Sequence, residues 1–160
     1  MPKTRTENPQ ARVAWYAWLR AHTALEQLFE RELDAACGMS LAYYDVLILL
    51  WREPERRMRM SELADQVLLS RSWLTRRIDQ MEADGLVARC TDPHDGRVVL
   101  AKLTSKGVRA FVRAERAHAR AIEQHFSQQL SRSQVAMLLE VMDALDARTR
   151  EVLRGEREDD

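Results

Sequence analysis

The sequence predicts a mainly helical protein with one small β-hairpin, and three observations support this fold class. Gly and Pro are scarce, five and four in 160 residues, and lie outside the long stretches with helical periodicity. Apolar residues recur at helical spacing near both ends of the chain. Between the ends, two β-rich segments flank a turn rich in Asp, Pro and Gly. We expect one domain over 1–160, with long dimerisation helices at 9–36 and 108–153 around a central lobe at 40–107.

The first long helix is predicted to begin at Asn8-Pro9, because Asn caps helices and Pro suits the first helical position. It is predicted to end near Ala36, before Gly38. Its apolar surface is wide for so small a domain, which indicates that it packs on a partner as well as on its own core. The residues of this surface are Trp15, Trp18, Leu19, His22, Leu25, Leu28, Phe29 and Leu33.

A second helix is predicted from its cap Ser40 to Trp51, followed by a short strand at 58–60. Ser61 is the predicted cap of the next short helix, and Ser70 the cap of the one after it, which runs to 84. The short third helix and the helix at 70–84 form a helix pair, an arrangement that places its second helix in a DNA groove. The inward residues expected of the second helix are Tyr43, Val46, Leu47 and Leu50.

The helix predicted at 70–84 has two contrasting faces. At 100° per residue, Leu74, Ile78 and Met81 share one face and are predicted to be core. The opposite face has small polar residues that can approach base edges or phosphates, and an arginine that can fork onto guanine. Another interpretation of this helix alone is a solvated, salt-bridged face. The residues of the opposite face are Ser72, Thr75, Arg76 and Asp79.

Charge is distributed unevenly around this helix. The chain is neutral overall, with 25 basic and 25 acidic residues, but 67–78 contains three arginines and no acid. Arg71 lies in the first turn, where free backbone amides also favour phosphate. Arg77 points more to the side and is expected either to reach phosphate or to pair with an acid inside the protein. A locally positive surface can therefore bind nucleic acid despite zero net charge.

A hairpin with a charged tip follows Gly85, the residue expected to end the helix in a left-handed conformation. Arg89 ends its first strand, the turn spans 92–97, and 98–100 form the return strand. Arg97 beside the turn is placed to enter a minor groove. Asp95 is expected to fix the rotamer of Arg97, whereas Asp92 either pairs with Arg89 or caps the turn.

The last third of the chain predicts two more helices. Helical periodicity returns at Thr104 and continues to Leu130, and Ser131 with Gln134 forms a capping box that begins another helix. Apolar stripes at both ends of the chain exceed what 160 residues can bury internally, so we expect a homodimer of intertwined terminal helices. A monomeric helical bundle is the alternative.

Composition narrows the functional classes. No signal peptide is visible, no apolar run approaches the roughly 20 residues of a membrane span, and two cysteines suit a reducing cytoplasm. The sequence has no phosphate-binding glycine loop, metalloprotease histidine pair or nucleophile motif, so we expect no enzyme. His118 and His125 share a helix face, but nothing completes a metal site, and no metal or cofactor is expected.

Several segments of the central lobe form a combined pattern that is specific, although each piece alone is weak. They are Met60-Ser61-Glu62-Leu63-Ala64, Ser70, Leu74-Thr75-Arg76, Met81-Glu82-Ala83-Asp84-Gly85-Leu86-Val87-Ala88-Arg89, Asp92-Pro93-His94-Asp95-Gly96-Arg97 and Leu103-Thr104-Ser105-Lys106-Gly107. This pattern resembles the multiple-antibiotic-resistance regulator (MarR) family.

The resemblance implies a dimeric winged helix-turn-helix transcription regulator, usually a repressor, that binds a palindromic operator in double-stranded DNA. It implies that helix 70–84 enters the major groove and that Arg97 at the wing tip enters the minor groove. The main alternative is a winged-helix module that binds another protein and no DNA. The exposed pair Arg76 and Arg97 discriminates between them, because an interaction module has no need of both.

The family often releases DNA when a small aromatic or phenolic acid binds between the dimer lobe and the reading head. Such an anion needs a stacking surface and an arginine, for which Arg77 is the candidate. Packing in the core is the alternative role of the aromatic residues. A redox switch at Cys37 or Cys90 is disfavoured, because oxidant sensors of the family keep a cysteine near the start of the first helix. The candidate pocket residues are Trp18, His22, Tyr43, Tyr44, Trp51 and Trp73.

Overall fold

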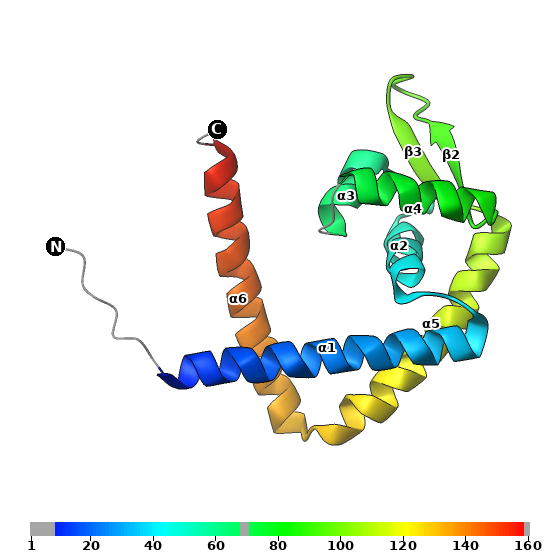
Figure 1. Cartoon of the computed structure of the whole chain (residues 1–160). Helices are drawn as coiled ribbons and strands as arrows, with labels where there is room; N and C mark the ends of the chain where they lie inside the picture. Colours follow the sequence, from blue (N-terminus) through cyan, green and yellow to red (C-terminus); the bar gives the residue numbers. More distant parts are fainter. Residues whose placement is uncertain (1–8, 68–70, 159–160) are drawn as a thin grey trace. The chain divides into compact units, whose positions relative to one another are not determined.

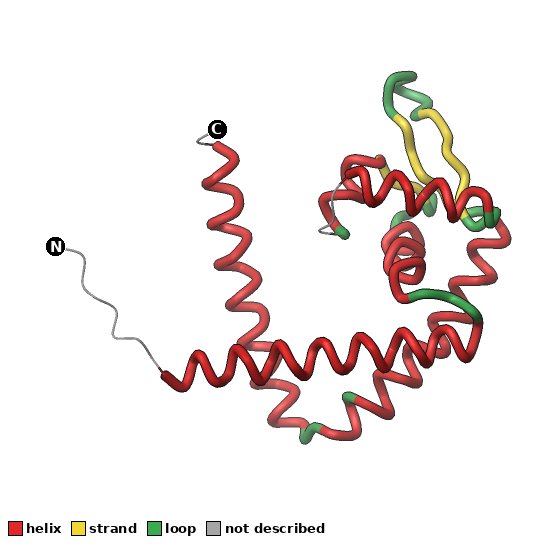
Figure 2. The backbone as a smooth tube through the Cα atoms, in the orientation of Figure 1, coloured by secondary structure: helices red, strands yellow, loops and turns green. Residues whose placement is uncertain are grey.

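The computed structural model describes residues 9–67 and 71–158, with the backbone alone at Arg71 and over 153–158. It is mainly helical with one three-stranded antiparallel sheet, which confirms the predicted fold class (Figures 1 and 2). The elements are α1 (Pro9–Cys37), α2 (Leu41–Arg52), β1 (Arg57–Arg59), α3 (Met60–Gln66), α4 (Arg71–Ala83), β2 (Val87–Thr91), β3 (Val99–Leu103), α5 (Ser105–His125), the 3-10 turn η1 (Ser127–Gln129) and α6 (Arg132–Glu158).

The chain divides into two compact units, residues 1–120 and 121–160. The second unit contains the end of α5, then η1 and α6. The prediction of a helix continuing to Leu130 was wrong, because α5 ends at His125 and the chain then tightens into η1. The predicted capping box is confirmed: Ser131 N–H donates to Gln134 Oε1 at 2.8 Å, and Gln134 N–H donates to Ser131 Oγ at 3.3 Å.

The sheet has the strand order β1-β3-β2, so β3 pairs with both neighbours. β2 and β3 form the predicted hairpin, which extends past α4 in Figure 1. Its register pairs Val87 with Leu103 at the root and Thr91 with Val99 toward the tip. Val87 and Leu103 are buried, which anchors the root of the hairpin in the core.

The core of the first unit is built around α2. Val46, Leu47 and Leu50 are fully buried, and each such side chain contributes about 1.5–3 kcal/mol by leaving water. Leu74, Ile78 and Met81 of α4 are at most 1% exposed, which confirms their predicted place in the core. Other buried residues packed with them are Leu33, Met58, Leu63, Leu86, Val87, Ala101, Leu103 and Phe111.

Tyr44 connects α2 to α5 in this core. Its ring centroid lies 4.3 Å from that of His118 and 6.0 Å from that of Phe111, and its hydroxyl donates to Glu115 at 2.5 Å. Burial raises the pKa of Tyr44, and the acceptor Glu115 raises it further. Burial also lowers the pKa of His118. Tyr44, which was not among the predicted inward residues, is therefore the buried tyrosine of α2 because α5 packs against it, whereas the predicted Tyr43 is only partly buried.

Helix starts agree with the sequence at one position and differ at another. Ser40 caps α2 as predicted, with Tyr43 N–H donating to its Oγ at 3.3 Å. The prediction of Ser61 as a cap was wrong: β1 continues directly into α3, so the cap is Arg59, in extended conformation and without a side-chain cap bond. The predicted caps Asn8 and Ser70 lie outside the described residues.

The end of α4, the root of the wing and the start of α5 meet at Thr104. Gly85 has a φ of 69°, and Leu86 N–H donates to Met81 O at 2.8 Å, as in a Schellman end. Thr104 Oγ1 donates to Gly85 O at 2.7 Å and accepts from Gly107 N–H at 3.0 Å. A Cβ on Gly107 would lie 1.9 Å from Leu86 O, so only glycine fits there.

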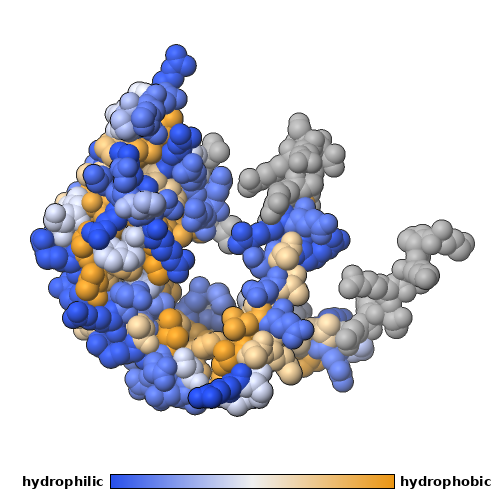
Figure 3. Space-filling view, turned by 180° about the vertical axis from the view of Figure 1, so that it is seen from behind, coloured by the Kyte–Doolittle hydropathy of each residue, from blue (hydrophilic) through white to orange (hydrophobic). Residues whose placement is uncertain are grey.

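The solvent exposure of the apolar residues of α1 changes along the helix. Toward its C-terminal end Leu33 is fully buried, whereas Val13, Trp15 and Tyr16 near its start are 69%, 56% and 53% exposed. In the second unit, α6 likewise exposes apolar residues, among them Met137. Hydrophobic residues reach the surface in the lower part of Figure 3. Exposed apolar surface of this kind usually marks an interaction site.

Candidate nucleic-acid interface

α4 presents a polar surface opposite its buried face. Ser72, Thr75 and Arg76 are exposed, as their spacing predicts. Arg71 is the first residue of α4, but its side chain lies outside the described part of the chain. Among the side chains that the structure describes on this surface, Arg76 therefore supplies the positive charge, and it lies in the middle of the helix.

The guanidinium of Arg77 lies over two aromatic rings. Its guanidinium carbon is 4.7 Å from the centroid of the Trp73 ring and 5.4 Å from that of Tyr43. Tyr43 in turn donates from its hydroxyl to Asp84 at 3.0 Å. Burial and this carboxylate raise the pKa of Tyr43, so its hydroxyl stays protonated and donating. These contacts join α2 to α4 through side chains on their surface.

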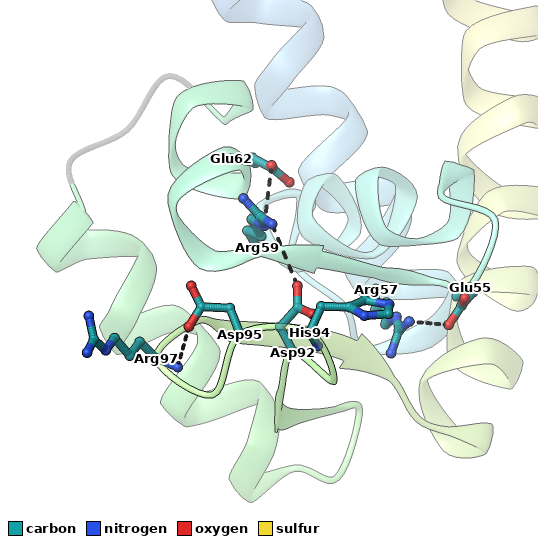
Figure 4. A network of polar contacts seen from close by, with 8 residues as sticks. All are labelled: Glu55, Arg57, Arg59, Glu62, Asp92, His94, Asp95 and Arg97. Carbon is teal, nitrogen blue, oxygen red and sulfur yellow. Dashed lines mark hydrogen bonds and ion pairs between the residues drawn. The ribbon is translucent and has the colours of Figure 1, made fainter.

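The wing tip is held by short backbone contacts to its two aspartates. Asp92 Oδ1 accepts from His94 N–H at 2.8 Å, and Asp95 Oδ1 accepts from Arg97 N–H at 3.0 Å (Figure 4). Asp95 thus fixes the backbone of Arg97, while the arginine side chain extends away from the turn. Arg97 is exposed at the end of the projecting hairpin.

A second arginine connects the wing to α3. Arg59 at the end of β1 lies 3.7 Å from Asp92 and 3.9 Å from Glu62 (Figure 4). The backbone N–H of His94 and then the charge of Arg59 hold the pKa of Asp92 below its usual value. Of the two roles considered for Asp92, the structure therefore shows the turn cap, and its cationic partner is Arg59 rather than Arg89.

Arg89 of β2 reaches back to α4. One terminal nitrogen lies 2.6 Å from Glu82 and the other 2.6 Å from Asp79. Glu82 also accepts the backbone N–H of Arg89 at 2.9 Å, and these two contacts hold the pKa of Glu82 below its usual value. The second terminal nitrogen additionally donates to Thr75 O at 3.5 Å. The wing strand is thus fastened to the helix that carries Ser72, Thr75 and Arg76.

The candidate pocket residues do not gather in one place. Trp18 and His22 are exposed neighbours on α1, with ring centroids 5.4 Å apart, and His22 lies 3.3 Å from Glu26. Tyr44 belongs to the core, and Trp51 packs beside Phe111 with centroids 5.0 Å apart. Tyr43 and Trp73 both lie against the guanidinium of Arg77.

Two hollows share Trp73 as a wall. One, of about 290 Å³, lies among α2, α3 and α4 and is mainly apolar. The other, of about 250 Å³, is lined by Trp73, Arg76, Arg77 and Gln80. The second combines a stacking surface with two guanidinium groups, which is the chemistry that an aromatic anion requires.

A third hollow, between α1 and α2, has three acidic side chains in its lining and one basic side chain, Arg31. Glu26, Glu30 and Asp45 line it, and Leu41 N–H donates to Glu30 at 2.6 Å. Burial, followed by the charges of Glu26 and Glu30, raises the pKa of Asp45. This corner of the molecule disfavours an anionic ligand.

Comparison with known proteins places the chain in a family. The profile of the MarR family matches residues 39–99. YdgJ, an uncharacterized HTH-type transcriptional regulator of Bacillus subtilis, is 32% identical over 76 residues, which are 48% of this chain and 45% of YdgJ. AbsC, a MarR family transcriptional regulator from Streptomyces coelicolor, is 27% identical with a TM-score of 0.84, covering 92% of this chain and 99% of AbsC.

A fuller match decides the assignment. Sco3205, a MarR family transcriptional regulator from Streptomyces coelicolor whose structure was solved in complex with DNA, is 31% identical with a TM-score of 0.82, and the match covers 91% of each chain. The chain belongs to the MarR family. Membership of this family of transcriptional regulators confirms the expectation that the protein is not an enzyme.

Within this MarR-family chain, sequence reasoning missed three contributors to the lobe. Asp79 was assigned only to an exposed face, and the roles of Glu82 and Arg59 were not recognised. The usable signal was the spacing of Asp79 and Glu82, because residues three apart on a helix point the same way. A basic residue on the following strand is then a natural partner for both.

Over 9–67 and 71–158, no group of three His, Cys, Asp or Glu side chains is arranged to hold a metal ion. In the same segments no single helix is long and apolar enough to cross a membrane, and α1 and α2, bent by 81°, pass that test only when taken as a pair.

Proposed function

We propose that this chain is a sequence-specific DNA-binding regulator that acts as a homodimer on a palindromic operator, most simply as a repressor. In this proposal α4 enters the major groove, with Ser72, Thr75 and Arg76 toward the bases, and Arg97 enters the adjacent minor groove. The observation that carries it is the joint exposure of Arg76 on α4 and Arg97 at the tip of a wing fastened to the same helix. Arg71 is expected to contact phosphate.

Two facts support the DNA target over a protein target. Sco3205, which the chain matches over 91% of its length, was solved with DNA bound. The wing and α4 are also joined by ion pairs, so their two exposed arginines keep a fixed spacing. A fixed pair of cations suits the regular spacing of grooves in a duplex.

The homodimer is supported by the apolar surfaces of both units. Trp15 and Leu19 on α1 are 56% and 42% exposed, and Leu139 and Leu145 on α6 are 59% and 56% exposed. A second copy supplies matching apolar surface and gives the two-fold symmetry that a palindrome requires. Both cysteines are unpaired, in keeping with a cytoplasmic site of action.

For ligand control we propose a small aromatic acid bound at the hollow lined by Trp73, Arg76, Arg77 and Gln80. The ring would stack on Trp73 and the carboxylate would pair with the arginines. Because Arg76 is also the proposed base-reading residue, such a ligand would compete directly with DNA. Titration of substituted benzoates should release DNA from the wild type but not from Trp73→Ala, and equal release from both would exclude this site.

The DNA proposal is tested by selecting duplexes from a random-sequence library with the wild-type protein. The expected product is a palindrome whose half-sites are about one helical turn apart. Arg76→Ala should weaken binding to it by about 1–3 kcal/mol and relax one position of the sequence. Recovery of no enriched sequence, with no binding to duplex DNA at low salt, would instead favour the protein-interaction module.

Arg97→Ala separates a wing contact from a reading contact. It should weaken binding to selected and random duplexes alike, and reduce the slope of log affinity against log salt by about 0.9 for one lost phosphate contact. His94→Ala, at the same exposed turn, is the matched control and should leave the slope unchanged. A wild-type slope in Arg97→Ala would remove Arg97 from the interface.

A further inference from the structure

Asp79 is an acid on a surface where DNA binding would require positive charge. It is 58% exposed and lies one turn after Arg76 on the same side of α4. Left alone, its carboxylate would repel phosphates and would be in range to pair with Arg76, since residues three apart on a helix are neighbours. Either effect would weaken the proposed contact of Arg76 with DNA.

Arg89 forms an ion pair with the carboxylate of Asp79. Its guanidinium lies 2.6 Å from Asp79 and 2.6 Å from Glu82, and also donates to the carbonyl oxygen of Thr75. The fork of an arginine suits two carboxylates that lie one turn apart. The side chain of Arg89 is only 27% exposed, and both terminal nitrogens have partners within α4. The guanidinium of Arg89 therefore has little hydrogen-bonding capacity left for a phosphate.

We propose that Arg89 is a positioning residue for DNA recognition, which acts by neutralising Asp79 and so keeps Arg76 available, without contacting DNA itself. The proposal rests on the DNA binding proposed above. It explains how a chain of zero net charge can retain an acid on its proposed reading helix: Asp79 and Arg89 together fasten the wing to α4, and Arg89 offsets the negative charge of Asp79.

The test is a double-mutant cycle of Arg89→Ala and Asp79→Asn, each measured for affinity and salt dependence on the selected palindrome and on a random-sequence duplex. Arg89→Ala alone should lower affinity for the palindrome about tenfold. Asp79→Asn alone should bind as well as wild type or better. The double variant should recover to within about threefold of wild type, because the repelling carboxylate is gone.

The salt dependence separates this role from a phosphate contact. In Arg89→Ala the salt slope should equal that of wild type, since no phosphate contact is lost. A slope lower by about 0.9, together with no recovery on adding Asp79→Asn, would show that Arg89 contacts DNA and would overturn the proposal. Wild-type affinity in Arg89→Ala would overturn it as well.

Thermal melting shows whether each variant is folded. If Arg89→Ala melts below the assay temperature, Arg89→Met keeps the apolar stem and takes its place in the cycle with the same expected results. Binding by the wild type is measured first. If the wild type binds neither duplex, the proposed function has failed; if it binds but Asp79→Asn does not rescue the arginine variant, only the role of Arg89 has failed.

Discussion

The two halves of α1 have similar apolar patterns but different surroundings. In the C-terminal half, Leu33 is fully buried and the ring of Phe29 lies edge-on to His118, with centroids 5.4 Å apart. In the N-terminal half, Trp15 and Leu19 remain largely exposed. Periodicity alone therefore identifies the apolar face of a helix, but not whether the chain itself buries that face.

The largest expected effect comes from placing negative charges in the exposed N-terminal half of α1. Trp15→Glu with Leu19→Glu should abolish the proposed dimer at micromolar concentration and weaken operator binding about 100-fold or more, because two half-sites are no longer engaged together. Analytical ultracentrifugation gives the mass, and Arg20→Glu, exposed on the same helix, is the control that should stay dimeric. A dimer that survives both glutamates would place the interface elsewhere.

Truncation in the buried half should act on folding instead. Leu33→Ala should lower the free energy of unfolding by about 2–5 kcal/mol through lost burial and the cavity left behind. Leu19→Ala is the matched truncation in the exposed half. Its unfolding, followed by denaturant titration at a concentration too low for dimers, should change by about 0.5 kcal/mol at most. Equal losses would mean that both halves are buried within one chain.

The smallest effect concerns pH. Because burial lowers the pKa of His118, there is a pH range in which the imidazole is protonated in the unfolded chain but neutral in the folded chain. Stability from this residue is complete above the unfolded pKa of about 6.5 and declines as pH falls below it. His118→Gln should reduce the change of the denaturation midpoint between about pH 7 and 5, whereas His94→Gln on the exposed wing should leave that change as in the wild type. An unchanged pH dependence in His118→Gln would contradict the lowered pKa of the partly buried imidazole.

The features that the sequence predicted best are set by a few neighbouring residues. Ser40, Gly85 and the pair Ser131 and Gln134 act on backbone groups within a turn or two, and all are found as expected. The core face of α4 is equally local, since a 3.6-residue period fixes it. The family resemblance, carried by the 60–107 segment, added the winged helix-turn-helix to the predicted fold class.

What the sequence did not predict depends on distant partners. Ser61 does not cap α3 because β1, held by its pairing with β3, delivers the chain straight into the helix. Tyr44 is buried because α5, more than 60 residues later, brings Phe111 and Glu115 against it. The partners of Arg89 likewise follow from how the wing folds back over α4, which local pattern does not encode.

The meeting point at Thr104 has a consequence for how the molecule would measure a duplex. One hydroxyl joins the end of α4 to the start of α5, and the close approach of Gly107 to Leu86 leaves no slack between α5 and the wing root. We therefore expect α4 and the wing to move together with the start of α5. If α4 and the wing bind neighbouring grooves as proposed, a DNA sequence whose local twist changes the offset between those grooves would weaken both contacts together.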